Sequence, residues 1–73
     1  MPHVIVKMLA GRTEEHKVKL AHELTRTVIS ALGCAEKSVS IGIEDVAPSD
    51  WTDLVYNPDI LGKPETIYKK PNY

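Results

Sequence analysis

A helical stretch between two short apolar runs restricts the fold of this chain most strongly. Residues 3–9 are rich in Val, Ile, Met and Leu, and residues 38–46 alternate between apolar and polar side chains, as in β-strands. Between them, residues 13–32 carry apolar side chains at spacings of three and four: Val18, Ala21, Leu24, Val28 and Leu32. Strand, long helix and strand predict an α/β unit in which a right-handed crossover joins two parallel strands.

The ends of the predicted helix have their own signals. Thr13 is a good N-cap, and Glu14 and Glu15 lie in the first turn, where the helix dipole favours acidic side chains. Gly33 can adopt the left-handed conformation that ends a helix. These residues predict a helix that begins near residue 13 and ends near residue 32.

The last third of the chain has a weaker pattern. Residues 48–56 predict a short helix or turn with Ser49 as its N-cap. From Asn57 onward the prolines and Gly62 predict a mostly extended C-terminal tail over 57–73, with a turn or short strand around Thr66. We expect one domain, residues 1–73.

Assembly follows from the predicted layers. One helix covers one face of a two-stranded sheet, whereas a parallel sheet generally has both faces buried. We therefore expect a homo-oligomer, with two-fold pairing as the commonest arrangement.

Composition excludes several classes of function. The net charge is −1 with both signs interspersed, so nothing suggests binding to nucleic acid or to an anionic membrane. No apolar run approaches the length of a membrane span. Cys34 is the only cysteine, which favours a reducing compartment, and we expect a soluble cytoplasmic protein. His16 and His22 point in different directions around a helix, so no metal site is expected.

The chain begins Met1-Pro2. Removal of the methionine would leave a secondary amine at the end of the first predicted strand, where proline is tolerated. An α-amino group titrates near pH ~7.7–8.0 in model peptides, so this amine could serve as a base near neutral pH.

These features occur in an order that resembles the 4-oxalocrotonate tautomerase family. The segments are Pro2 before the first strand, Gly11-Arg12-Thr13-Glu14-Glu15 before the helix, Ser38-Val39-Ser40-Ile41, and Trp51. The ending Tyr68-Lys69-Lys70-Pro71-Asn72-Tyr73 is similar to that of the phenylpyruvate-type bacterial branch. The resemblance implies a β-α-β protomer that pairs into a four-stranded sheet dimer, and in some members a trimer of dimers.

The resemblance also implies a cofactor-free reaction on a small enol or keto acid. Pro2 would be the acid/base, Arg12 would bind the substrate carboxylate and Trp51 would wall the pocket. Ser40 stands where dicarboxylate-isomerising members have a second arginine, and a hydroxyl cannot bind a carboxylate bidentately. A monocarboxylic substrate, such as a phenylpyruvate-like acid, is therefore expected.

Other functions stay open at this point. The chain could be an oligomeric scaffold that has kept the fold without the chemistry. It could also be a hydratase or dehalogenase relative, with Asp53 activating water. His3 is either a structural residue or part of the substrate pocket.

Overall fold

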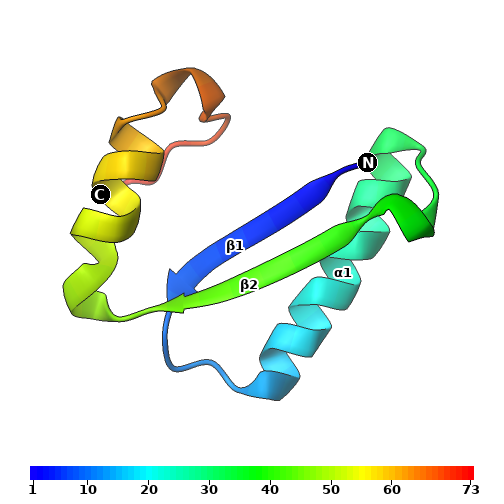
Figure 1. The fold of residues 1–73 in the computed structure, drawn as a ribbon, viewed down its shortest axis with the longest axis horizontal. Coiled ribbons are helices and arrows are strands. Elements are labelled where there is room, and N and C mark those ends of the chain that lie inside the picture. Colours follow the sequence, from blue (N-terminus) through cyan, green and yellow to red (C-terminus); the bar gives the residue numbers. More distant parts are fainter.

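The computed structural model describes all residues, 1–73, and contains the predicted β-α-β unit. The strands β1 (His3–Leu9) and β2 (Ser40–Val46) form a parallel two-stranded sheet, and the helix α1 (Glu14–Leu32) connects them. In Figure 1 α1 runs alongside the two strands, and the C-terminal segment leaves the carboxyl end of β2 on the side away from α1. The prediction of two parallel strands joined by one long helix is confirmed.

Both ends of α1 have the predicted caps. The Thr13 hydroxyl oxygen accepts a hydrogen bond from the backbone N–H of His16, at 3.1 Å. Gly33 has φ 68°, a conformation that side-chain-bearing residues rarely adopt, and its N–H donates to the Ile29 carbonyl. Local residue chemistry therefore accounts for the length of this helix.

Strand register divides the sheet into two faces. Val4 pairs with Ile41 and Val6 pairs with Ile43, and these four side chains are half-buried. The opposite face, which we call the outer face, carries His3, Ile5, Lys7 and Leu9 of β1 and Ser40, Gly42, Glu44 and Val46 of β2. On the outer face, Val46 is buried, whereas Ile5 is 52% exposed and Leu9 is 48% exposed. The chain itself thus covers this face only in part.

The protomer buries very little. Only Val46 and Val55 are buried, and no side chain of α1 is fully buried. Val18 and Leu32, which we predicted on the apolar stripe of the helix, are 61% and 66% exposed. A domain of this size is marginally stable even with a normal core, so these exposed apolar side chains favour further burial by another chain.

The start of β2 differs from the prediction by two residues. We expected the strand to begin at Ser38, but Glu36–Ser38 form a 3-10 turn (η1) in which the Ser38 N–H donates to the Ala35 carbonyl. The Ser38 side chain also hydrogen-bonds this carbonyl. The local bonds compete with strand pairing, and β2 therefore begins at Ser40.

The C-terminal segment departs further from the prediction. A 3-10 turn, η2 (Pro48–Asp50), leads into a π-helix, η3 (Thr52–Leu61), and a second 3-10 turn, η4 (Pro64–Thr66), follows. The predicted extended tail is wrong for residues 57–61, because Pro58 lies inside η3. The predicted N-cap at Ser49 is also wrong, since η2 begins at Pro48 and has no side-chain cap.

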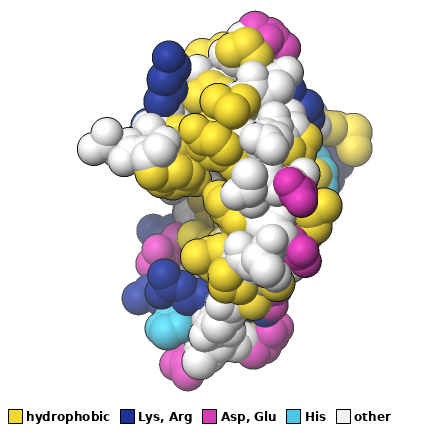
Figure 2. Space-filling view, turned by 90° about the vertical axis from the view of Figure 1, so that its left-hand side faces the viewer, with side chains coloured by type: hydrophobic (Ala, Val, Ile, Leu, Met, Phe, Trp, Pro, Cys, Tyr) yellow, Lys and Arg dark blue, Asp and Glu magenta, His cyan; other side chains and the backbone are white.

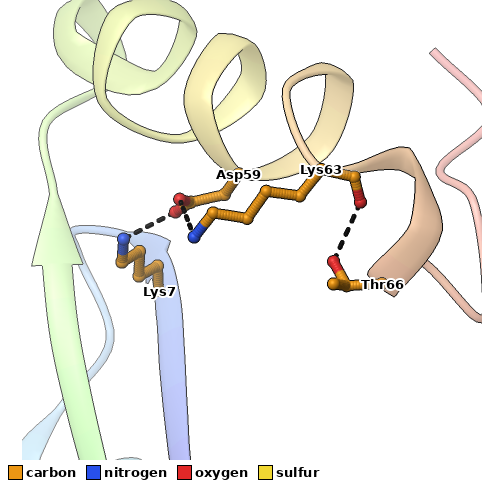
Figure 3. A network of polar contacts seen from close by, with 4 residues as sticks. All are labelled: Lys7, Asp59, Lys63 and Thr66. Atoms are coloured by element: carbon orange, nitrogen blue, oxygen red, sulfur yellow. Dashed lines mark hydrogen bonds and ion pairs between the residues drawn. The ribbon is translucent and has the colours of Figure 1, made fainter.

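Ion pairs connect these elements. The Lys17 ammonium group pairs with Asp45, which joins α1 to β2. The Lys7 ammonium group lies 2.5 Å from Asp59 Oδ2, and Lys63 approaches the other oxygen of Asp59 at 3.6 Å (Figure 3). The contact between Lys7 and Asp59 therefore joins β1 to η3. Neither α1 nor any other helix has the apolar length needed to cross a bilayer.

Candidate active site

Pro2 lies directly before β1 at the amino end of the sheet. Its carbonyl accepts a hydrogen bond from the backbone N–H of Ser40, at 3.2 Å, and its side chain is half-buried. Met1 is fully exposed. The fold therefore fixes the backbone at Pro2, and Met1, which would be removed, does not contribute to the packing.

His3 and Ser40 form a side-chain pair next to Pro2. They are register partners across the sheet, and His3 Nδ1 lies 2.6 Å from Ser40 Oγ. Both side chains are exposed in the single chain. The alternation of each strand was predictable from the sequence, but the contact depends on register, which the sequence alone did not supply.

Arg12 lies beyond the other end of β1. It follows Gly11, whose φ of 126° allows the turn toward α1. The Arg12 side chain is exposed and makes no hydrogen bond or ion pair within the chain. Its guanidinium group is therefore free to bind an anion from outside the protomer.

Trp51 follows the carboxyl end of β2, immediately before η3. Its indole Nε1–H donates to the Tyr73 hydroxyl oxygen at 3.2 Å, and the side chain is half-buried. The rings of Tyr56 and Tyr73 pack with their centres 5.6 Å apart. These three residues hold the end of the chain against η3, whereas Tyr68 is fully exposed.

The four predicted site residues therefore separate into two pairs. Pro2 and Ser40 lie at the amino end of the parallel sheet, and Arg12 and Trp51 follow its carboxyl end. At about 3.3 Å per residue, the strands place these ends roughly 20 Å apart. One protomer does not bring all four residues around one small substrate.

The hollow at the carboxyl end has the wrong charge for an acid substrate. It has a volume of about 310 Å³ and lies where the ends of the strands meet the C-terminal segment. Three carboxylates, those of Glu44, Asp45 and Asp50, line it together with the single cation Lys7. The hydrogen bond to Asp59 raises the pKa of Lys7 and lowers the pKa of Asp59. This lysine is already neutralised by its partner, so the hollow does not favour an anion.

Two other hollows lie away from Pro2. One is a 260 Å³ apolar hollow within the C-terminal segment, between Tyr56, Ile67 and Tyr73. The other runs along an exposed side of α1, between Glu23 and Ala31. Apolar side chains cover much of the side of the molecule seen in Figure 2, and Leu54 and Leu61 of η3 are more than half exposed. Exposed apolar side chains therefore occur both on the outer face of the sheet and on the C-terminal segment.

The remaining candidates do not form a site of their own. Asp53 is exposed and makes no side-chain hydrogen bond or ion pair. No cluster of three or more His, Cys, Asp or Glu side chains has an arrangement suited to a metal ion. The polar side chains that the structure joins beside Pro2 are those of His3 and Ser40.

Known proteins similar to this chain share one description. The sequence model of a family described as "Tautomerase enzyme" matches residues 2–53, beginning at Pro2. A probable tautomerase of Xylella fastidiosa is 42% identical over 73 residues, which cover all of this chain and 89% of the relative. Tautomerase PptA of Cronobacter sakazakii is 32% identical over 74 residues, covering all of this chain and 97% of the relative.

Solved structures agree with the sequence comparisons. A structure from work on the 4-oxalocrotonate tautomerase isozymes of Methylibium petroleiphilum superposes with a TM-score of 0.66 and 30% identity. The superposition covers 68% of this chain and 81% of the other. Fold, family model and full-length relatives lead to the same assignment: the chain belongs to the tautomerase family and is an isomerase.

Proposed function

We propose that the mature chain is a cofactor-free tautomerase of small monocarboxylic 2-oxo acids, with phenylpyruvate-like acids as the substrate class. Pro2 acts as the acid/base that moves a proton between carbon and oxygen of the keto and enol forms. The observation that carries this proposal is the fixed position of Pro2 at the head of β1, beside Ser40. Similarity to proteins named tautomerase PptA supports the substrate class.

The amine of Pro2 is suited to this work once Met1 is removed. It is a secondary amine on a rigid ring, so its lone pair has a direction set by the fold. The α-amino group has an ordinary pKa close to neutral pH, where a base can both take and return a proton efficiently. With Met1 attached, the same nitrogen is part of an amide and cannot act as a base.

Arg12 and Trp51 complete the site from a second chain. Antiparallel pairing of two protomers about a two-fold axis places the amino end of one sheet beside the carboxyl end of the other. This arrangement brings a guanidinium group and an aromatic wall to Pro2, and the exposed outer face at Ile5 and Leu9 can then pack against a further chain. The pairing gives a dimer, which can assemble further into a trimer of dimers.

Ser40 limits the substrate to one carboxylate. It lies in register with His3 next to Pro2, and its hydroxyl can make one directed hydrogen bond but no bidentate clamp. Arg12 then holds the only carboxylate, and Ser40 is available for the reacting oxygen. Acids with two carboxylates would leave one of them without a cation.

Replacement of Pro2 tests the proposal. Pro2→Ala should lower turnover of phenylpyruvate by at least about a hundredfold, as expected for loss of a positioned base. Pro48→Ala, which alters an exposed proline at the start of η2, is the matched control. Intact-mass measurement should first show that Met1 is absent from both proteins. Equal turnover by Pro2→Ala and the mature wild type would rule out the role of Pro2.

A further inference from the structure

The side chains of His3 and Ser40 form a hydrogen bond with each other at the amino end of the sheet. His3 Nδ1 and Ser40 Oγ are 2.6 Å apart, a distance typical of a strong hydrogen bond. Ser40 also donates its backbone N–H to the carbonyl of Pro2. The serine is thus bound to the imidazole through its side chain and to the proposed base through its backbone.

The surroundings hold the imidazole against β2. A β-carbon built at Gly42 would stand 3.9 Å from His3 Cε1, so the ring lies along the row formed by Ser40 and Gly42. The next charged side chains on the outer face, Lys7 and Glu44, lie four residues further along their strands. Lys7 is engaged by Asp59. No charged group on this face competes with Ser40 for His3.

The bond to His3 determines what Ser40 can offer a ligand. A serine hydroxyl has one hydrogen and two lone pairs. When His3 donates from Nδ1 to Ser40 Oγ, the hydroxyl hydrogen points away from the imidazole and can be donated to another oxygen. When Nδ1 accepts that hydrogen instead, Ser40 can only accept from a ligand. The imidazole therefore sets the direction of the serine hydroxyl.

We propose that His3 is a positioning residue that directs the Ser40 hydroxyl toward the reacting oxygen of the substrate. This inference rests on the proposed tautomerase function and adds a second polar group to the reaction. As Pro2 removes a proton from carbon, negative charge develops on the keto oxygen, and a fixed donor is most valuable at that stage. No covalent bond forms or breaks at either residue. The pair therefore favours acids that carry a keto oxygen next to an enolisable carbon.

Five variants of the mature protein test the pair. His3→Leu removes the hydrogen-bonding ring, Ser40→Ala removes the hydroxyl, and the double variant removes both. His3→Asn keeps a polar atom at the same number of bonds from the backbone as Nδ1. His22→Leu is the matched control, because His22 is an exposed histidine of α1. Steady-state kcat and KM for phenylpyruvate are measured for each variant.

We expect His3→Leu and Ser40→Ala each to lower kcat about tenfold, the loss typical of one directed hydrogen bond, with KM nearly unchanged. The double variant should be no slower than Ser40→Ala alone, because the two residues act through one contact. His3→Asn should recover most of the lost kcat, and His22→Leu should match the wild type.

Several results would overturn the inference. If the fold losses of kcat in the two single variants multiply in the double variant, the two residues act independently. An unchanged kcat or a raised KM in His3→Leu would remove the positioning role. A His3→Asn variant as slow as His3→Leu would do the same. Failure of the proposed function gives a different result, in which the mature wild type itself has no turnover or Pro2→Ala retains it.

Discussion

The two ends of the sheet carry different chemistry although the same two strands form both. At the amino end, Pro2, His3 and Ser40 are joined by hydrogen bonds and carry the proposed base and a hydroxyl. At the carboxyl end, Arg12 offers an unpaired cation and Trp51 offers an aromatic surface. We propose that the amino end moves a proton and that Arg12, at the carboxyl end, holds the carboxylate of the substrate.

We infer from this difference that each end is half of a site. The parallel direction of β1 and β2 forces the two sets of residues apart, because both strands begin at one end and finish at the other. No side-chain movement closes a gap of roughly 20 Å along two strands. In the proposed dimer, a second protomer that runs in the opposite direction would close it without any change of fold.

The largest effect should come from charging the outer face between the two ends. Ile5→Lys places a charged side chain where we expect another protomer of the oligomer to lie, and burying that charge without a partner is very unfavourable. We expect the oligomer to dissociate and activity to disappear with it. Light scattering coupled to size-exclusion chromatography measures the assembly, and phenylpyruvate turnover measures activity.

Thr27→Lys is the control for this experiment. It adds the same charge at an exposed polar position of α1 and should leave both assembly and turnover intact. An Ile5→Lys protein that remained an active oligomer would show that the outer face is not the interface.

Mixing two impaired variants tests whether the ends meet between chains. Pro2→Ala lacks the base and Arg12→Ala lacks the cation, so each protein alone should have very low activity at substrate concentrations well below the wild-type KM. If each site takes Pro2 from one chain and Arg12 from the other, a mixed dimer has one intact site. Random exchange of equal amounts should restore about a quarter of wild-type activity.

Mixed dimers form only when the two variants exchange subunits. The variants are therefore unfolded together and refolded, and each variant is also refolded alone for comparison. A site formed within a single chain predicts no recovery in the mixture. The result therefore distinguishes a shared site from two separate ones.

Arg12→Ala by itself should separate the roles of the two ends. Loss of the guanidinium group weakens carboxylate binding, and a bond to a charged group contributes about 1.5–3 kcal/mol, which corresponds to a KM raised by roughly tenfold to a hundredfold. Changes at His3 should instead lower kcat. The control is Arg26→Ala, since Arg26 is an exposed arginine of α1. A lowered kcat with unchanged KM in Arg12→Ala would show that the guanidinium group does not hold the carboxylate.

The sequence predicted the β-α-β unit because each boundary has a local cause. Thr13 and Gly33 cap α1, and β-branched apolar residues that alternate with polar or small residues mark β2. The C-terminal segment was predicted less well, since Pro58 and Gly62 ordinarily break helices. The helix η3 tolerates Pro58 inside it, and Val55 anchors the segment as one of the two buried residues. That packing is tertiary and has no signature in a short window of sequence.

The candidate site shows the same division. The resemblance identified Pro2, Arg12, Ser40 and Trp51, but only topology shows that they lie at opposite ends of the sheet. The contact between His3 and Ser40 depends on strand register, and the contact between Lys7 and Asp59 joins residues 52 positions apart. Neither contact could be predicted from spacing along the chain.

The smallest effect concerns the ion pair that ties the carboxyl end of the sheet to η3. Hydrogen bonding to Asp59 raises the pKa of Lys7, and hydrogen bonding to Lys7 lowers the pKa of Asp59. The raised pKa gives a stabilisation that is present below pH 10.5 and is lost as pH rises through the folded-state value of Lys7. The lowered pKa gives a stabilisation that is present above pH 3.8 and is lost as pH falls through the folded-state value of Asp59.

Asp59→Asn should therefore lower the melting temperature slightly at neutral pH and leave it unchanged at the acidic limit, where Asp59 is protonated in the wild type. We expect a decrease of no more than a few degrees, because both side chains are partly exposed and solvent screens their attraction. Glu65→Gln, which removes an exposed carboxylate with no ion-pair partner, is the control. Equal melting temperatures for Asp59→Asn and the wild type from pH 3 to pH 8 would mean that η3 is held by Val55 and the aromatic contacts alone. The carboxyl end would then depend on packing, in contrast to the hydrogen-bonded amino end.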